Sequence, residues 1–210
     1  GAVLALRVLL WACYRPTVAS HEDALPQLAV VIPAFNEGPM VRRAIESVLA
    51  SRYPADRLHL IVVDDGSTDG TAHHIRGAAV AGRVTVLTLA ENRGKRHALY
   101  AGFGAAHGRR AEVVATVDSD SIVPVESLAA LVAPLVQRPE VAAVAGKVTA
   151  HNRHQNLLTR MLGVRYILGF DFIRAYQSVL RTVWCCPGAL QAYRLAVIAP
   201  HLAAWRDQRL

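Results

Sequence analysis

Residues 58 to 69 read LHLIVVDDGSTD, a continuous apolar run that stops in two carboxylates, Asp64 and Asp65, and then turns through Gly66. Such a run is typical of a strand buried on both faces of a parallel sheet. Open α/β sheets bind their ligands at the carboxyl ends of such strands. Taken alone, the motif fits equally well with a turn that caps the next helix.

Strand-like and helix-like segments alternate on both sides of this stretch. Short apolar runs predict strands at 28–33, 58–63, 84–90, 112–117 and 141–148. Apolar residues at helical spacing predict helices at 40–51, 69–81, 95–108 and 125–137. Strands joined by helices of this length form right-handed crossovers. We therefore expect an α/β fold with a Rossmann-like, mainly parallel sheet and helices on both faces.

Polar residues follow four of the predicted strands, at the point where each strand ends. The clusters are Pro33 to Glu37, Asp64 to Ser67, Glu91 to Arg96 and Asp118 to Asp120. Because parallel strands end on one edge of a sheet, we expect the four clusters to meet in one crevice. Their coincidence favours a ligand site over four unrelated turns.

The cluster Asp118-Ser119-Asp120 has the chemistry of a site for a hard divalent cation. Two carboxylates can share such an ion, which prefers oxygen ligands and completes its shell with phosphate oxygens and water. A pair at this spacing is also frequent by chance, so its weight comes from the other three clusters.

Two basic residues, Lys95 and Arg96, are predicted to open a helix directly after Gly94. Their charges and the amino terminus of the helix would favour the same anion, such as a diphosphate. As surface charges without a ligand, they would oppose the helix dipole.

The composition limits the kinds of ligand. The chain has 210 residues, a formal net charge of +7 and a pI near 9.8. This favours an anionic ligand, an anionic membrane surface or nucleic acid, unless the charge only solvates the surface. Nucleic acid ranks last, because the basic residues form no block and aromatic residues are few. Cys13, Cys185 and Cys186 form no CxxC pair, which indicates a reducing compartment.

Two apolar segments lie outside the strand–helix pattern. Residues 1–14 are apolar except for Arg7 and are shorter than the ~18 to 20 residues of a membrane span. They predict the end of a longer membrane helix or an interfacial helix, or else a helix packed on the domain, and 15–27 predicts a linker. Residues 151–180 mix large apolar side chains with four arginines, which suits either a membrane interface or an ordinary domain helix.

The motifs IPAFNE, VVDDGSTDGT, NRGKRHAL and VDSDS, in this order and spacing, resemble the catalytic domain of family-2 glycosyltransferases with the GT-A fold. The later stretch RAYQSVLRTVWCCPGALQAYR is similar to hyaluronan synthases and the rhizobial chitin-oligosaccharide synthase. The resemblance covers roughly residues 28 to 199. It implies inverting, processive transfer from a UDP-sugar to a growing β-linked polysaccharide, with Mg²⁺ or Mn²⁺ on the diphosphate.

The resemblance also implies roles for single residues. Those expected at the nucleotide are Pro33, Asn36, Glu37, Asp64, Asp65, Lys95, Arg96 and Asp118. Asp118 and Asp120 would be catalytic, with Asp118 on the ribose or donor sugar and Asp120 on the metal. Those expected at the acceptor are Cys186, Pro187, Gly188, Tyr193 and Arg194. The expected partners are the donor, an oligosaccharide or polysaccharide acceptor and, through flanking helices, the cytoplasmic face of the inner membrane, with no nucleic acid.

The chain departs from the family pattern after residue 194. The family's general base lies in a short acidic motif beyond the Tyr-Arg pair, and the surroundings of Asp207 do not match it. We therefore expect residues 28–210 to be a catalytic domain truncated at its carboxyl end, with little activity in isolation. The alternatives are another poly-N-acetylglucosamine or non-processive family-2 enzyme, and a non-catalytic subunit that binds nucleotide sugars. A nucleotidyltransferase would need a basic glycine-rich loop where PAFNEG stands.

Overall fold

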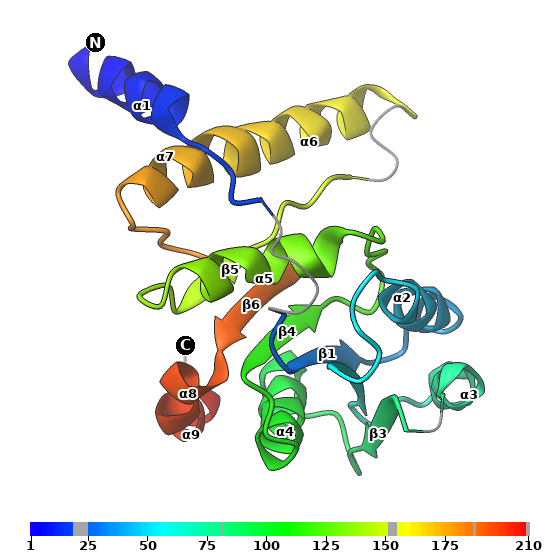
Figure 1. Cartoon of the computed structure of the whole chain (residues 1–210). Helices are drawn as coiled ribbons and strands as arrows, with labels where there is room; N and C mark the ends of the chain where they lie inside the picture. The colour runs from blue at the N-terminus through cyan, green and yellow to red at the C-terminus, as the bar shows by residue number, and fades with distance from the viewer. Residues whose placement is uncertain (19–24, 81, 151–154, 187, 209–210) are drawn as a thin grey trace.

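In the described part of the chain, six strands form one sheet in the order β3-β2-β1-β4-β6-β5 (Figure 1). A computed structural model describes residues 1–18, 25–80, 82–150, 155–186 and 188–208. The strands are β1 (Leu28–Ala34), β2 (Leu58–Asp64), β3 (Val84–Thr88), β4 (Val113–Val117), β5 (Ala143–Ala145) and β6 (Leu190–Arg194). β1 to β4 run parallel, whereas β6 runs antiparallel to β4 and β5. The expected α/β fold with a mainly parallel sheet is confirmed.

The register of the strands places three strand ends together. β1 pairs with β2 from Leu28 opposite Leu58 to Ala34 opposite Asp64. On its other side, β1 pairs with β4. The chain order therefore reverses between β1 and β4, which is the switch point where an open α/β sheet leaves a crevice for a ligand.

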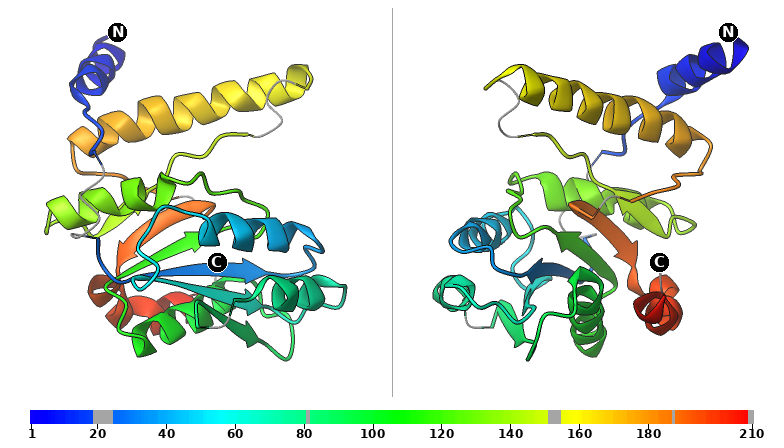
Figure 2. Two further views of the ribbon diagram at one scale, coloured as in Figure 1. Left: turned by 45° about the vertical axis from the view of Figure 1, so that its right-hand side comes forward. Right: turned by 180° about the vertical axis from the view of Figure 1, so that it is seen from behind.

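Helices cover both faces of the sheet (Figure 2). One face carries α2 (Met40–Leu49), α3 (Thr71–Ala78) and α5 (Ser127–Gln137). The other carries α4 (Lys95–Gly108), α8 (Leu195–Ile198), η3 (Ala199–His201) and α9 (Leu202–Asp207).

Strand β1 is buried at every position and divides its side chains between the two faces. Val30 and Ile32 belong to the core under α2, and Ala29 and Val31 to the core under α4. This alternation is the period-2 pattern of a strand. Helix α4 comes closest at Gly102, where an added Cβ would lie 2.3 Å from a methyl of Val31.

Four helical elements, which we call the helical arm, stand beyond α5 and away from the sheet (Figures 1 and 2). They are α1 (Ala2–Cys13), α6 (Leu157–Ile167), the π-helical turn η2 (Leu168–Ile173) and α7 (Arg174–Val179). The last three are continuous, and α1 packs against α7. Over the described residues, we find no helix with both the length and the apolar character needed to cross a bilayer.

The predicted elements fall at the observed positions up to residue 137, with shifts of a few residues at their ends. β5 is shorter than the predicted strand 141–148, since it pairs with β6 alone at the edge of the sheet. β6 was not predicted, because its mixed sequence LQAYR carries no clear strand pattern. The predicted linker 15–27 includes Leu25, which is buried in the core, and its residues 19–24 lie outside the described part.

Candidate functional site

A cavity of about 270 Å³ opens at the carboxyl ends of β1, β2 and β4. Its walls come from all four predicted polar clusters, so the expected single crevice is present. The lining residues are Pro33, Ala34, Phe35, Glu37, Asp65, Asn92, Gly94, Lys95, Ala98, Asp118, Ser119 and Asp120.

Asp65 holds the loop between β3 and α4 against the end of β2. Its Oδ1 accepts from the backbone N–H of Arg93 at 3.1 Å, and its Oδ2 from that of Gly94 at 2.9 Å. Gly94 has a φ of +89°, which suits glycine, and it is the residue before α4. The buried carboxylate therefore sets where α4 begins and where Lys95 enters the cavity.

Gly66 allows the same loop to come close to β2. Its φ is +72°, and an added Cβ would lie 2.6 Å from the carbonyl carbon of Glu91. No side chain fits at that distance without moving backbone. The glycine of the DDG motif is thus required by the approach of two strand-end loops.

Asp64 and Asn36 do not line the cavity. Asp64 is buried, and its Oδ1 accepts from the backbone N–H of Ser67 at 3.0 Å. Asn36, at a φ of +53°, accepts through Oδ1 from the backbone N–H of Thr68 at 2.9 Å. Both side chains shape the turn after β2, which is the capping use of Asp and Asn. Their predicted contact with a nucleotide stays a prediction.

Lys95 and Asp118 form an ion pair inside the cavity. Lys95 Nζ donates to Asp118 Oδ1, and both side chains remain partly accessible. Among the described residues that line the cavity, four supply carboxylates, Glu37, Asp65, Asp118 and Asp120, and Lys95 supplies one ammonium. A diphosphate would meet a negative wall unless a cation accompanied it.

The carboxylate oxygens of this wall could supply part of the ligand shell of a hard divalent cation. Asp118 and Asp120 supply carboxylate oxygens, and Asp120 is exposed. Within the described ranges, no three His, Cys, Asp or Glu residues gather as a metal site. An ion here would have one or two carboxylate ligands and would take the rest from phosphate oxygens and water, as Mg²⁺ commonly does.

Arg96 points away from this cavity. It lies over the ring of Trp205, with 5.9 Å between its Cζ and the ring centroid, and donates to the carbonyl of Gln208. It lines a second, open cavity of about 650 Å³ between the amino end of α4 and α9. Asp207 also lines that cavity, where a bidentate pair with Arg206 lowers the pKa of its carboxyl.

The predicted acceptor loop lies beside Lys95. A Cβ on Gly188 would be 3.0 Å from Lys95 Nζ, and the Gly188 carbonyl accepts from Thr116 Oγ1 at 3.4 Å. Cys186 is half-buried, and burial raises the pKa of its thiol. Pro187 lies outside the described residues. The loop is therefore next to the ion pair, although none of its described residues lines the cavity.

Tyr193 and Arg194 lie on β6, on opposite faces of the sheet. Tyr193 packs with the core under α4, and burial raises the pKa of its hydroxyl. Arg194 Nη2 donates to the carbonyl of Leu135 at 2.8 Å, at the end of α5. Neither lines the cavity, so an acceptor role for this pair stays a prediction.

Six lining residues were not among the predicted site residues: Ala34, Phe35, Asn92, Gly94, Ala98 and Ser119. Phe35 and Asn92 have the largest side chains of these. Phe35 is an exposed aromatic side chain directly after β1. Asn92 Oδ1 accepts from the backbone N–H of Gly94 at 2.8 Å. Phe35 and Asn92 both lie within the polar clusters at the strand ends, and that position is the only feature of the sequence that could have indicated a place in the site.

Strand order and crevice position together define an α/β domain with an acidic ligand crevice at the switch point of its sheet. The chain belongs to glycosyl transferase family 2, whose model matches residues 29–201.

Two curated relatives are similar over almost the whole chain. Hyaluronan synthase of Streptococcus pyogenes is 33% identical over 212 residues, which are 98% of this chain and 49% of the relative. N-acetylglucosaminyltransferase of Rhizobium meliloti (strain 1021) is 35% identical over 226 residues, which are 99% of this chain and 52% of the relative. The chain thus spans about half the length of the curated relatives it matches.

Two solved structures share the fold. A mannosyltransferase from Pyrobaculum calidifontis in complex with GDP-Man and Mn²⁺ matches with a TM-score of 0.66 at 25% identity, over 95% of this chain and 55% of that one. Glucosyl-3-phosphoglycerate synthase from Mycobacterium tuberculosis matches with a TM-score of 0.56 at 22% identity, over 84% and 60%. The fold is therefore of the GT-A type.

Proposed function

We propose that this chain is the donor-binding part of a polysaccharide synthase of the hyaluronan or chitin-oligosaccharide type. It would take a sugar from a UDP-sugar and pass it, with inversion and processively, to a growing β-linked polymer. The observation that carries the proposal is the meeting of Asp65, Lys95, Asp118 and Asp120 in one cavity at the switch point of the sheet. The relatives named as synthases support the type of product.

The chemistry follows from the charges of the cavity. Asp120, with Asp118 beside it, would hold Mg²⁺ or Mn²⁺, which when bound would neutralise the diphosphate against the acidic wall. Lys95 Nζ already lies at Asp118 and would turn to the departing diphosphate, which gains negative charge as the bond to the sugar breaks. Glu37, Pro33 and the rim residue Phe35 would surround the nucleoside.

The acceptor would approach from the loop that contains Cys186 and Gly188, which stands beside Lys95. Removal of its hydroxyl proton needs a base, and Asp207 is poorly suited because its carboxylate is bound to Arg206 at the other cavity. We propose that a carboxylate outside this sequence supplies that step. The chain alone would then bind donor and metal but polymerise slowly, with a loss on the order of 10²- to 10⁴-fold.

The same proposal places the protein at the cytoplasmic face of the inner membrane, where a donor from the cytoplasm can reach it. Support comes from the synthase relatives and from the apolar helix α1, in which no residue is buried. A non-catalytic subunit that binds nucleotide sugars would keep the same cavity, so only turnover distinguishes it.

Calorimetric titration of UDP tests the site. We expect Mg²⁺ or Mn²⁺ to raise the UDP affinity of the wild type, and Asp120→Ala to abolish that gain, a change of about tenfold or more. Asp56→Ala, an exposed carboxylate before β2, is the matched control and should behave as the wild type. Equal UDP affinity with and without metal in all three proteins would refute the metal assignment.

A further inference from the structure

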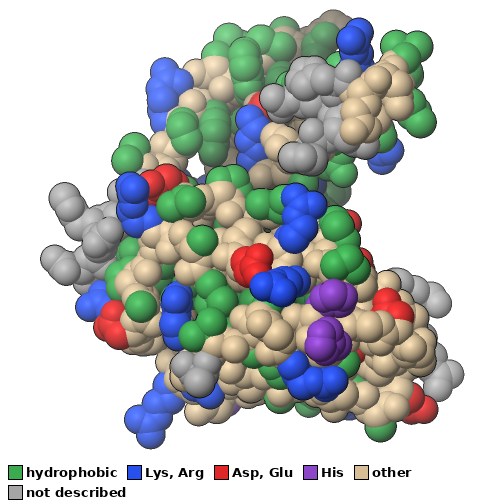
Figure 3. All heavy atoms as spheres, turned by 90° about the vertical axis from the view of Figure 1, so that its right-hand side faces the viewer, with side chains coloured by type: hydrophobic (Ala, Val, Ile, Leu, Met, Phe, Trp, Pro, Cys, Tyr) green, Lys and Arg blue, Asp and Glu red, His purple; other side chains and the backbone are tan. Residues whose placement is uncertain are grey.

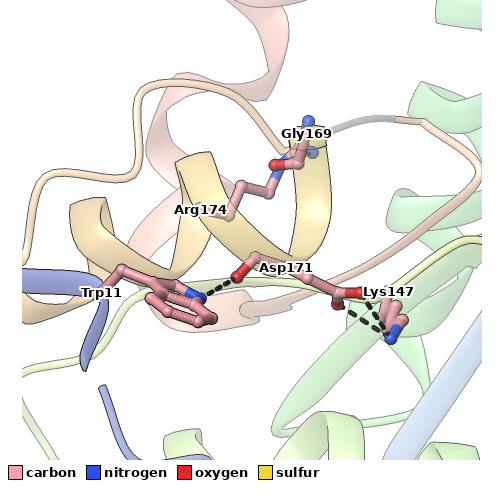
Figure 4. A network of polar contacts seen from close by, with 5 residues as sticks. All are labelled: Trp11, Lys147, Gly169, Asp171 and Arg174. Atoms are coloured by element: carbon pink, nitrogen blue, oxygen red, sulfur yellow. Dashed lines mark hydrogen bonds and ion pairs between the residues drawn. The ribbon is translucent and has the colours of Figure 1, made fainter. Parts of the chain in front are cut away.

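The π-helical turn η2 connects the helical arm with other parts of the molecule. The carboxylate of Asp171 pairs at 2.8 Å with Lys147, in the segment after β5 (Figure 4). The backbone carbonyl of Asp171 accepts from the indole N–H of Trp11 in α1 at 2.8 Å. Turns of this kind are frequent at functional sites. The turn thus joins α1 to the segment after β5, and its remaining polar groups lead to the predicted acceptor loop.

Arg174, the residue directly after this turn, makes three contacts with one guanidinium group. Its Nη1 donates to the carbonyl of Gly169 at 3.1 Å, and its Nε donates to the carbonyl of Cys185 at 3.4 Å. Its Cζ lies over the ring of Phe170, 4.1 Å from the centroid. A planar guanidinium can hold several partners in fixed directions, whereas an ammonium group acts as a point charge. The group therefore suits a bridge between the turn and the loop.

The turn fixes the side chain of Arg174 before it reaches the loop. The carbonyl of Gly169 accepts from the backbone N–H of Arg174, which closes the turn, and also from Nη1 of the same residue. Figure 4 shows the side chain of Arg174 directed toward Gly169. With one side of the guanidinium held in this way, Nε is placed to hold Cys185.

The other end of the predicted acceptor loop is held by β4, next to the cavity. The carbonyl of Gly188 accepts from Thr116 Oγ1 at 3.4 Å, and the carbonyl of Ala189 accepts from the backbone N–H of Asp118 at 3.3 Å. A Cβ on Gly188 would lie 3.0 Å from Lys95 Nζ. The loop therefore runs from the guanidinium of the arm to the ion pair in the cavity.

Burial contributes little at the arm end of this loop. Among the described elements, those of the helical arm pack mainly on one another. The space-filling view shows the arm as a lobe above the body of the domain (Figure 3). Leu180 and Trp184, between α7 and Cys185, have exposed fractions of 51% and 87%. The hydrogen bond from Arg174 therefore carries more weight here than it would inside a core.

We propose that Arg174 is a positioning residue for the acceptor sugar. It would hold the predicted acceptor loop where the sugar can meet the donor at Lys95 and Asp118. Its guanidinium acts through the loop and touches no reacting atom, so its removal should weaken acceptor binding and leave donor binding unchanged. The inference rests on the proposed function and adds a residue of the arm to the acceptor side of the site.

Two titrations separate the acceptor from the donor. With UDP and Mg²⁺ present, a β-linked N-acetylglucosamine tetrasaccharide should bind Arg174→Gln about three- to tenfold more weakly than the wild type, because the sugar must then order the loop. The affinity for UDP should be unchanged. Arg174→Lys keeps the charge but not the bridge and should regain only part of the loss. Asp171→Asn breaks an exposed ion pair and should cost less than about threefold.

The thiol of Cys186 reports the position of the loop without any substrate. Burial raises the pKa of this thiol, whereas the charge of Arg174 lowers it. Loss of the charge alone would therefore slow the reaction with dithiodipyridine, because the thiolate is the reactive form. Release of the loop would instead expose the thiol. In a background of Cys13→Ser with Cys185→Ser, we expect Arg174→Gln to react about three- to tenfold faster.

Arg165→Gln is the matched control, because it removes an exposed arginine from the same arm. It should bind UDP and the tetrasaccharide as the wild type does, and its thiol should react at the same rate. Circular dichroism of every variant checks the fold, and Arg174→Lys and Asp171→Asn carry the test if Arg174→Gln does not fold.

Four results would overturn the inference. They are no binding of the tetrasaccharide by the wild type, equal changes in Arg174→Gln and the control, full recovery in Arg174→Lys, and equal losses of UDP and tetrasaccharide affinity in Arg174→Gln. A wild type that does not bind UDP would refute the donor site, and the rate of the Cys186 thiol would still decide whether Arg174 holds the loop.

Discussion

The strand-end cavity and the helical arm are built in opposite ways. The cavity stands on β1, which is buried throughout, and the loop between β3 and α4 is held by hydrogen bonds from its backbone N–H groups to the buried Asp65 carboxylate. The arm exposes large apolar side chains, and its helix α1 is held to the other three elements through contacts such as the hydrogen bond from Trp11 to Asp171. The difference teaches that the cavity gets its shape from the buried sheet, whereas the arm places large apolar side chains outside the core.

If the loops around the cavity belong to the core, the glycine at which two of them meet backbone to backbone should have the largest effect. Gly66→Ala would force backbone atoms apart at a positive φ, and we expect it to lower the free energy of unfolding by about 2 to 4 kcal/mol. UDP binding should fall with it. Gly77→Ala, in α3 with open space around it, should be neutral or stabilise by up to about 1 kcal/mol. Urea unfolding measures both, and equal effects would contradict the close approach.

Removal of the Asp65 carboxylate should have the next largest effect. Asp65→Ala leaves the N–H groups of Arg93 and Gly94 without this acceptor, at a cost of about 2 kcal/mol in unfolding free energy. The control is Asp56→Ala, which removes an exposed carboxylate. Loss of UDP affinity at unchanged stability would mean that Asp65 acts as a ligand contact and does not hold the loop.

A change in the arm should be smaller and should stay local. Trp11→Phe keeps the aromatic packing on Phe172 but loses the hydrogen bond to Asp171, worth about 0.5 to 1.5 kcal/mol. Hydrogen exchange in α1 should become faster while UDP binding stays the same. Trp184→Phe, at a highly exposed tryptophan, is the control. A parallel loss of UDP binding would show that arm and cavity are coupled more tightly than their contacts indicate.

The smallest effect is expected from pH, near the start of β2. His59 lies in β2, where burial, assisted by the charge of Arg109, lowers the pKa of its imidazole from the ordinary value of 6.5. The unfolded chain then takes up the proton first, so stability is lost as pH falls through 6.5 and levels off below the folded pKa. His59→Gln should reduce the change of the urea unfolding midpoint with pH in this range. If the midpoint of the variant changes with pH as much as that of the wild type, other titratable groups cause the pH dependence of stability.

Much of the site could be predicted because strand ends are marked locally. An apolar run followed by PAFNE, DDGS or DSD marks the end of a strand. Because these strands run parallel, their ends lie at the same edge of the sheet. The contribution of each residue within a cluster could not be predicted. Neighbours at a strand end such as Asp64 and Asp65 point in different directions, and Lys95 and Arg96 are separated by about 100° around α4.

The sequence by itself determined the alternating α/β order, the four polar clusters and the family resemblance, because all of these depend on local pattern and spacing. Only the tertiary structure decided that β6 enters between β4 and β5, that Asp65 holds the loop before α4, and that α1 joins the distant α7. These are contacts between segments far apart in the chain. Packing and the burial of backbone groups select them, and no local pattern records that choice.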